Sequence, residues 1–300
     1  MLGNQQTALS AYRNALKQDP AHPAARSGEA RMQAALRPPP APLGPEVYAR
    51  RGRNRVDAGD LAGARSAFEK SVRLAPENAR LWNDLGTVYA KLEDLERAEA
   101  AFKKAAELGP GAPQGLYNLG RLYAQKGLLE AAAEAYRNAL ERDPAFGPAR
   151  VNLGAVYLAW GDVAAAVSAF EKALEGDARD ADLYVSLGNA HLLEGALDDA
   201  ERAYRTAAEK DPASAAPHTG LGNIALSLGD TTAAVAHYQK AADLGPEAPA
   251  PRINLGTVYT AQGRQEEAIA EYHHALELAP EDPAVYFNLA VLYYQSEQYD

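Results

Sequence analysis

Apolar side chains recur along most of the chain at intervals of three and four residues, the spacing of one buried helix face. Between residues 80 and 92 they occupy Leu81, Trp82, Leu85, Val88, Tyr89 and Leu92. A second amphipathic segment follows, in which small side chains flank one aromatic ring: Ala98, Phe102 and Ala105, before Pro110. This pattern predicts two antiparallel helices joined by a short turn.

The same pair of segments recurs every 34 residues without insertion or deletion. Six full copies occupy residues 79–112, 113–146, 147–180, 181–214, 215–248 and 249–282. Each copy carries a Leu-Gly pair in its first segment: Leu85-Gly86, Leu119-Gly120, Leu153-Gly154, Leu187-Gly188, Leu221-Gly222 and Leu255-Gly256. A fixed period predicts an extended repeat array rather than one globular core, because each unit buries its apolar face against its neighbours.

The residues that carry the repeat read Trp82-x-x-Leu85-Gly86-x-x-Tyr89, then Ala98-x-x-x-Phe102-x-x-Ala105. This signature and its period resemble those of the tetratricopeptide repeat, or TPR. The resemblance implies an all-α fold, a right-handed superhelical solenoid of antiparallel helix pairs. It also implies a protein–protein interaction surface rather than an enzyme.

Small and large residues alternate in a way that suits close helix packing. Gly86 and Ala98 leave room for two helices to approach, and Tyr89 and Phe102 fill the remaining space. Glycine usually occupies the turn between the helices, where we expect a left-handed backbone that only glycine adopts without strain. The turn glycines are Gly127, Gly161, Gly195, Gly229 and Gly263.

The flanking segments depart from the repeat. Residues 1–36 match partial TPR-like helices, with a second helix over 7–20 and an alanine-rich helix over 23–36. Residues 37–44 are proline-rich and predict an extended linker or junction. Residues 283–300 begin a further, truncated copy, so we expect the chain to be part of a longer protein and its end to expose Tyr286, Phe287, Tyr293 and Tyr294.

Residues 45–78 form a degenerate copy, in which Arg51 and Arg55 occupy positions that hold Leu and usually Tyr elsewhere. Burying two unpaired guanidinium groups would cost several kcal/mol. One interpretation is a cap or junction whose first helix is partly exposed. Another is a basic patch for an acidic partner or a lipid headgroup, formed by Arg50, Arg51, Arg53 and Arg55; locally different packing is a third.

Composition narrows the functional classes. The chain has no cysteine, which excludes disulfides, thiol nucleophiles and thiolate metal sites. It has no apolar run that predicts a membrane span and no signal-peptide pattern at its start, and the compartment stays open with the cytoplasm slightly favoured. Residues 79–300 hold 18 Lys/Arg and 33 Asp/Glu, and this excess of negative charge disfavours nucleic acid as a partner.

The candidate chemistry does not favour catalysis. His191 and His218 occupy the Tyr and Trp positions of their repeats, which indicates packing roles, and the adjacent His273 and His274 point apart on a helix. No phosphate loop, nucleophile elbow or zinc motif is present. We therefore expect neither a metal site nor a cofactor.

The most informative pattern is a row of polar residues just before each Leu-Gly pair. The row reads Asp84, Asn118, Asn152, Ser186, Gly220, Asn254 and, in the partial copy, Asn288. Asparagine gains little from a mid-helix position. The resemblance implies that this row lies on the concave face of the superhelix. The row is similar to the asparagine ladder of the O-GlcNAc transferase superhelix, which holds an extended polypeptide. A carboxamide can pair with any peptide bond, but the row is also consistent with bonds between repeats.

Further positions expected on the concave face are Tyr117, Arg121, Asn189, Asn223 and Thr257. They do not reproduce the Lys and Asn pattern of the TPR clamp that grips acidic chaperone tails, so we do not expect that ligand.

We therefore predict a non-catalytic scaffold that binds a protein or an extended peptide in its concave groove. The alternatives are an assembly or stability factor that acts through its convex face or through self-association of its exposed ends, and a targeting module of a larger enzyme such as a glycosyltransferase.

Overall fold

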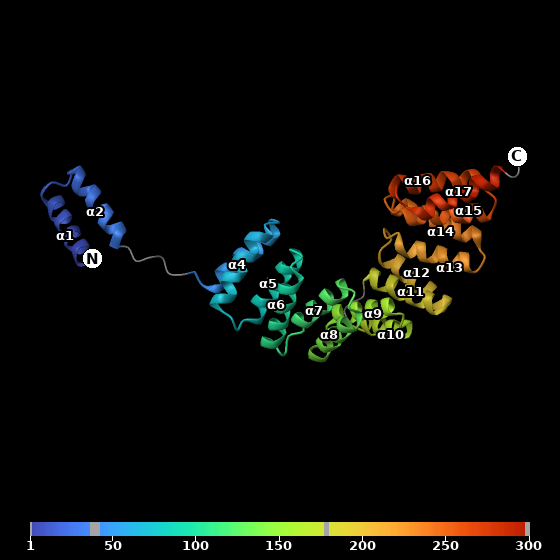
Figure 1. Ribbon diagram of the computed structural model, residues 1–300, viewed down its shortest axis with the longest axis horizontal. Coiled ribbons are helices and arrows are strands. Elements are labelled where there is room, and N and C mark those ends of the chain that lie inside the picture. The colour runs from blue at the N-terminus through green and yellow to red at the C-terminus, as the bar shows by residue number, and fades with distance from the viewer. Residues whose placement is uncertain (1, 37–42, 177–179, 298–300) are drawn as a thin grey trace.

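The computed structural model describes residues 2–36, 43–176 and 180–297, and these residues form seventeen α-helices and no strand. Figure 1 shows that helices α3 to α17 follow one curved arc. The helices are α1 (Leu2–Gln18), α2 (Pro23–Leu36), α3 (Pro45–Asp57), α4 (Leu61–Leu74), α5 (Ala79–Lys91), α6 (Leu95–Leu108), α7 (Gln114–Gln125), α8 (Leu129–Arg142), α9 (Gly147–Trp160), α10 (Val163–Leu174), α11 (Ala181–Glu194), α12 (Leu197–Lys210), α13 (Ala216–Ser227), α14 (Thr231–Leu244), α15 (Pro249–Ala261), α16 (Gln265–Leu278) and α17 (Pro283–Glu297).

Helices α3 to α16 pack as consecutive antiparallel pairs, and each pair also packs against the next. The first helix of most pairs additionally contacts the first helix of the next pair, as α5 does with α7 and α11 with α13. First helices are therefore closer together than second helices, and they line the inner, concave face of the superhelix. In Figure 1, α8 and α10 lie outside α7 and α9. These contacts confirm the predicted all-α solenoid of antiparallel helix pairs.

One contact repeats in every pair: an aromatic ring of the second helix lies against the glycine of the first helix. A Cβ atom added at Gly154 would lie 2.6 Å from Cε1 of Phe170, and one added at Gly188 would lie 2.7 Å from Cε1 of Tyr204. The rings of this series are almost completely buried: Phe68, Phe102, Tyr136, Phe170, Tyr204, Tyr238 and Tyr272. Only glycine lets the two helices approach this closely.

Helices α1 and α2 form a separate pair that uses a related contact. The ring of Tyr12 occupies the space where a side chain at Gly28 would begin, with Cε1 2.4 Å from the added Cβ. Helix α1 starts at Leu2, earlier than the second helix expected over 7–20. Most of the expected linker, residues 37–42, lies outside the described residues.

The turns within the pairs follow the expected glycine pattern. All five predicted turn glycines have positive φ angles, and Gly59 adds a sixth in the degenerate copy. The exception is the turn between α5 and α6, where Glu93 adopts φ of 60° in the position that glycine occupies elsewhere. A side chain in this region costs roughly 1–2 kcal/mol, so this turn retains strain that the other pairs avoid.

The arginines of α3 lie on the surface rather than in the core. Arg51 lies over the ring of Tyr48, with its Cζ 5.9 Å from the ring centroid. Arg55 forms an ion pair with Asp60 at 3.3 Å, and Arg53 bonds Asp84 of the next repeat at 2.9 Å. The first helix of this copy is thus partly exposed, as the cap or junction interpretation expects, and two of its four arginines have carboxylate partners.

Helix α17 exposes the four aromatic side chains that the sequence identifies. Tyr286, Phe287, Tyr293 and Tyr294 have exposed fractions of 54%, 68%, 46% and 65%. Its opposite face is buried against the preceding repeat through Val285, Leu289 and Leu292.

We predict that Gly154→Ala destabilises the array by about 1–3 kcal/mol, because the added methyl group overlaps the ring of Phe170. Hydrogen exchange of the 147–176 region and guanidinium unfolding, followed by circular dichroism, measure the effect. The neighbouring exposed residue supplies the control, and Ala155→Ser should change neither measurement appreciably. Unchanged hydrogen-exchange protection in Gly154→Ala would show that close contact between the ring and the glycine does not determine the stability of this repeat.

Candidate functional site

Two rows of side chains lie on the first helices, on either side of the Leu-Gly pair. We call the residue before the pair the upstream row: Asp84, Asn118, Asn152, Ser186, Gly220, Asn254 and, by its position in α17, Asn288. The residue after the pair forms the downstream row: Thr87, Arg121, Ala155, Asn189, Asn223 and Thr257. The two rows share a helix face because they are three residues apart. They therefore follow the inner face that the first helices form.

Two upstream asparagines bond the preceding repeat. The Nδ2 group of Asn118 donates to Oδ1 of Asn83 at 2.8 Å. Asn152 donates from Nδ2 to the hydroxyl oxygens of Tyr117 at 3.3 Å and Tyr136 at 3.4 Å. Within the described residues, no donor reaches the Oδ1 atom of either asparagine. Each carboxamide thus joins two repeats and keeps an acceptor for another molecule.

The downstream asparagines bond the buried tyrosine of their own repeat. Tyr204 donates its hydroxyl proton to Oδ1 of Asn189 at 2.7 Å, and Tyr238 does the same to Asn223 at 2.7 Å. Burial raises the pKa of both tyrosines to about 12, so their hydroxyl groups stay protonated near neutral pH. Among the described residues, the Nδ2 groups of these two asparagines have no acceptor. They present donors on the inner face.

The other upstream residues behave differently from one another. Asn254 and Asn288 make no side-chain hydrogen bond within the described part of the chain, whereas Ser186 donates to the carbonyl of Asp182 on its own helix at 2.9 Å. Gly220 must lack a side chain, because Cζ of Tyr204 would lie 2.4 Å from an added Cβ.

At the N-terminal end of the row, Asp84 accepts the bond from Arg53 described above. Burial nevertheless raises the pKa of the Asp84 carboxyl group, and Arg53 opposes that shift. The upstream row is therefore not a continuous series of equivalent side chains.

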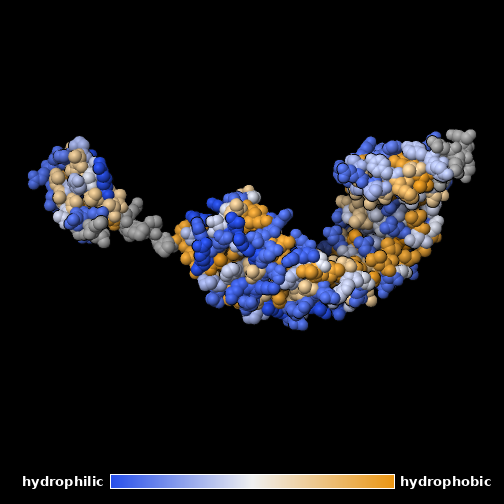
Figure 2. All heavy atoms as spheres, in the orientation of Figure 1, coloured by the Kyte–Doolittle hydropathy of each residue, from blue (hydrophilic) through white to orange (hydrophobic). Residues whose placement is uncertain are grey.

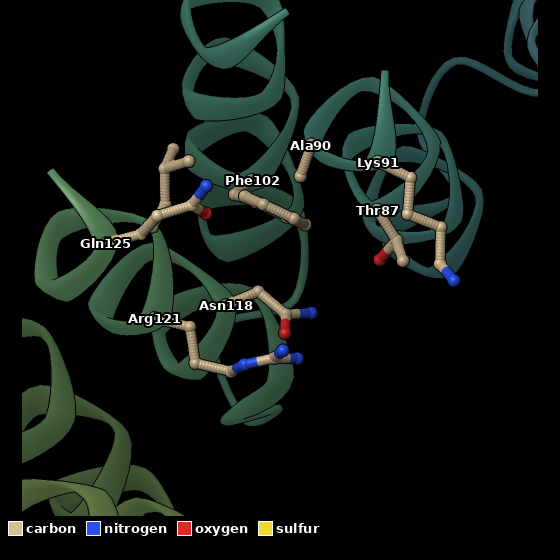
Figure 3. A pocket seen from close by; sticks show the side chains of 8 residues that line it. Thr87, Ala90, Lys91, Phe102, Asn118, Arg121 and Gln125 are labelled. Carbon is tan, nitrogen blue, oxygen red and sulfur yellow. The ribbon is translucent and has the colours of Figure 1, made fainter. Parts of the chain in front are cut away.

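Two open depressions lie next to each other on the inner face. The first has a volume of about 330 Å³ and lies between α5 and α7; it is lined by Thr87, Ala90, Lys91, Phe102, Asn118, Arg121, Leu122 and Gln125. The second has a volume of about 340 Å³ and is lined by Arg121, Ala124, Leu129, Tyr136, Asn152, Ala155, Val156 and Ala159. Figure 3 shows Asn118 and Arg121 extending side by side from α7, with Thr87 and Lys91 across the gap on α5.

The depressions bring together three of the residues predicted from the sequence, and a fourth, Tyr117, contacts one of them. Asn118 and Arg121 line the first, Arg121 and Asn152 line the second, and Tyr117 lies beneath Arg121 at 5.9 Å from its Cζ. Asn189, Asn223, Asn254 and Asn288 lie on later first helices, farther along the arc. In Figure 2, no described part of the chain fills the space between the N-terminal and C-terminal parts of the arc.

The tyrosine hydroxyl groups are a feature of this face that the sequence pattern does not identify. Tyr136, Tyr204, Tyr238 and Tyr272 occupy the ring position, which looks like a pure packing position. Their hydroxyl groups reach polar residues of the two rows, such as Thr257, whose Oγ1 lies 3.3 Å from the Tyr272 oxygen. The available signal was the use of tyrosine instead of phenylalanine at a buried position.

Histidine forms one unusual cluster away from these rows. The ring of His218 on α13 stacks on His237 of α14 at 5.9 Å between centroids, and its buried Nδ1 has no hydrogen-bond partner in the described structure. Burial lowers the pKa of both rings, and nearby Lys240 adds to the effect. The described residues contain no group of three or more metal-ligating side chains, and none of their helices is long and apolar enough to cross a bilayer.

Comparison with known proteins identifies the repeat. Residues 50–249 are covered by overlapping matches to a sequence profile described as tetratricopeptide repeat, over 50–113, 85–146, 117–181, 151–215 and 185–249. A second profile, described as TPR repeat, matches residues 256–296. No curated protein matches the chain.

Several solved structures resemble the chain. A tetratricopeptide repeat protein from Parabacteroides merdae has a TM-score of 0.64 and 21% identity, covering 83% of this chain and 98% of its own. A chain of the APC/C hetero-tetramer Cut9–Hcn1 has a TM-score of 0.63 and 17% identity, covering 96% of this chain and 52% of its own. YrrB, described as a TPR protein with an unusual peptide-binding site, has a TM-score of 0.53 and 25% identity, covering 62% of this chain and 95% of its own.

The histidine pair predicts a loss of stability in mild acid. Because burial lowers the pKa of His218 and His237, the folded protein binds fewer protons than the unfolded chain as the pH falls through the ordinary histidine range near 6.5. We expect a lower melting temperature at pH 5.5 than at pH 7.5. The double variant His218→Tyr/His237→Ala, which uses residues found at these positions in the 181–214 repeat, should show a smaller difference. An equal difference would exclude the pair as its source.

Proposed function

Because the chain belongs to the tetratricopeptide repeat family, we propose that it is a non-catalytic scaffold that binds an extended peptide segment of a partner protein along its inner face. The family supports a protein-interaction role in general. The choice of the inner face and of an extended ligand depends on the two polar rows. These rows supply hydrogen-bonding atoms at repeating intervals, as a ligand with a repeating backbone requires.

The observation that carries the proposal is the direction of the side-chain bonds. Asn118 and Asn152 use their donor groups inside the protein and leave Oδ1 as an acceptor. Asn189 and Asn223 use Oδ1 inside the protein and leave Nδ2 as a donor. A peptide backbone alternates donors and acceptors, so both kinds of group can be used by one extended chain. These side chains are also held in place before any ligand arrives.

Such a surface gains affinity from many small contributions. Each neutral hydrogen bond contributes about 0.5–1.5 kcal/mol in net terms. Because the protein side is already ordered, the conformational entropy lost on binding comes mainly from the peptide. The similarity to YrrB, a TPR protein described as having a peptide-binding site, is consistent with this ligand class.

Self-association is a second candidate, favoured by the exposed aromatic side chains of α17. Four such side chains on one helix form an apolar surface that a second copy of the chain could cover. Sedimentation velocity distinguishes the two candidates. A concentration-dependent dimer that Tyr286→Ser/Phe287→Ser abolishes would support self-association, and a monomer at all concentrations would exclude it.

The inner-face proposal predicts that peptides selected from a displayed library of random twelve-residue sequences bind the full chain through the asparagine rows. Asn118→Ala, Asn152→Ala and Asn254→Ala should each weaken binding of a selected peptide that covers the site by about fivefold, the equivalent of about 1 kcal/mol. Fluorescence anisotropy of the labelled peptide measures the affinity. Asn254→Ala should leave the melting temperature unchanged, since Asn254 makes no side-chain bond within the described residues.

The matched control is Asn138→Ala on the second helix α8, which should change neither binding nor inner-face contacts. Asn118→Ala and Asn152→Ala should also lower the stability, because each side chain bonds the preceding repeat. If none of the three inner-face variants weakens binding of any selected peptide, and Asn138→Ala binds like the wild type, the inner face is not the binding surface.

A further inference from the structure

The inner face differs in charge from the rest of the chain. The whole protein has a formal net charge of −10. In α9, α11, α13 and α15, however, neither polar row contains a charged residue: Asn152, Ala155, Ser186, Asn189, Gly220, Asn223, Asn254 and Thr257. The downstream row holds one cation, Arg121 in α7, and the corresponding positions of the degenerate 45–78 copy hold Arg50 and Arg53. The two rows are therefore uncharged from α9 to α15, and their unpaired cation lies toward the N-terminal end.

Among these cations, Arg121 has the strongest features of a ligand-binding residue. Arg53 is already paired with Asp84 at 2.9 Å. Arg121 is exposed, and no carboxylate of the described residues lies within ion-pair distance of it. Its guanidinium group lies over the ring of Tyr117, 5.9 Å from the centroid, which holds the side chain against α7. An arginine that is oriented but has no anionic partner is suited to bind an anion from another molecule.

The position of Arg121 identifies the kind of anion. Arg121 lines both depressions, one on the α5 side and one on the α9 side. A ligand chain that occupies both depressions passes over Arg121 and continues in both directions. The carboxylate that meets Arg121 then comes from a side chain within the segment and not from its terminus. Asn118, beside Arg121 in Figure 3, presents its Oδ1 acceptor to the backbone of the same segment.

We propose that the groove selects an extended peptide with an aspartate or glutamate side chain that binds Arg121 and with uncharged residues along α9 to α15. This inference rests on the proposed function. A charged side chain over the neutral repeats would lose its hydration without gaining a partner, so uncharged residues are favoured there. Lys91, across the first depression from Arg121, adds positive charge at the same end.

The surrounding negative charge makes this contact selective. A ligand carboxylate is repelled by most of an acidic protein and attracted at the N-terminal end of the groove. The ion pair therefore fixes the register in which the peptide lies, in addition to its contribution to affinity.

The first test compares the peptides that the wild-type chain and Arg121→Gln select from one displayed library. Each random twelve-residue sequence is followed by a neutral Gly-Ser linker, so that no terminal carboxylate lies within it. We expect the wild type to enrich Asp or Glu at one position, with uncharged residues on one side of it, and Arg121→Gln to lose that enrichment. Circular dichroism checks that the variant stays helical.

The second test measures the pairing in a synthetic form of the most enriched peptide, amidated at its C-terminus. Replacing its conserved acidic residue by the corresponding amide should weaken binding to the wild type about tenfold, as for loss of a charged hydrogen bond. The same replacement should have little effect on binding to Arg121→Gln. Increasing the salt concentration should weaken binding of the acidic peptide more than binding of the amide peptide. Arg137→Gln on α8 is the matched control, since Arg137 is exposed and lies outside both depressions.

The outcomes separate this inference from the proposed function. Selected peptides that depend on Asn118, Asn152 or Asn254 but show no acidic preference would overturn the role of Arg121 and leave the peptide-binding groove intact. An equal loss in Arg137→Gln and Arg121→Gln would assign the effect to general charge and overturn the inference as well. If the asparagine variants weaken binding of none of the selected peptides, the proposal that the groove binds peptides is rejected.

Discussion

The structure depends on the contact between an aromatic ring of each second helix and the glycine of its first helix. At Gly154 and Gly188 the rings of Phe170 and Tyr204 fill the volume where a side chain would begin. The contact sets the distance between the two helices of a pair. Because the pair is repeated at a constant period, the same distance recurs in every repeat. Because each repeat contacts only its neighbours, the curvature of the arc is the sum of many identical local contacts.

The same rings connect the core to the surface. Where the ring belongs to tyrosine, its hydroxyl group extends past the glycine and reaches the inner face, as Tyr204 reaches Asn189 and Tyr238 reaches Asn223. The hydroxyl group then orients the asparagine, which presents its Nδ2 group outward. Packing and the polarity of the inner face are therefore linked: the residues that hold the repeats together also determine which hydrogen-bonding atoms remain for a ligand.

Electrostatics adds a direction to a surface that would otherwise be uniform. The neutral rows of α9 to α15 suit a peptide backbone of any sequence, whereas Arg121 and Lys91 distinguish the N-terminal repeats. Arg53 lies at the same end but is neutralised by Asp84 of the next repeat. Among these three cations, Arg121 is the one held over an aromatic ring between two depressions, and unlike Arg53 it has no carboxylate partner among the described residues.

The period of the repeat, its Leu-Gly pair and its turn glycines were sufficient to predict the helix pairs and the solenoid, because these features are local and recur at fixed spacing. The sequence also located the asparagine row, but not the partner of each carboxamide. Asn118 bonds Asn83, Asn152 bonds two tyrosines, and Asn254 makes no side-chain bond to any described residue, although all three hold the same position in their repeats. Those differences depend on which side chains the adjacent repeat brings within about 3 Å, and the spacing of residues along one repeat carries no information about them.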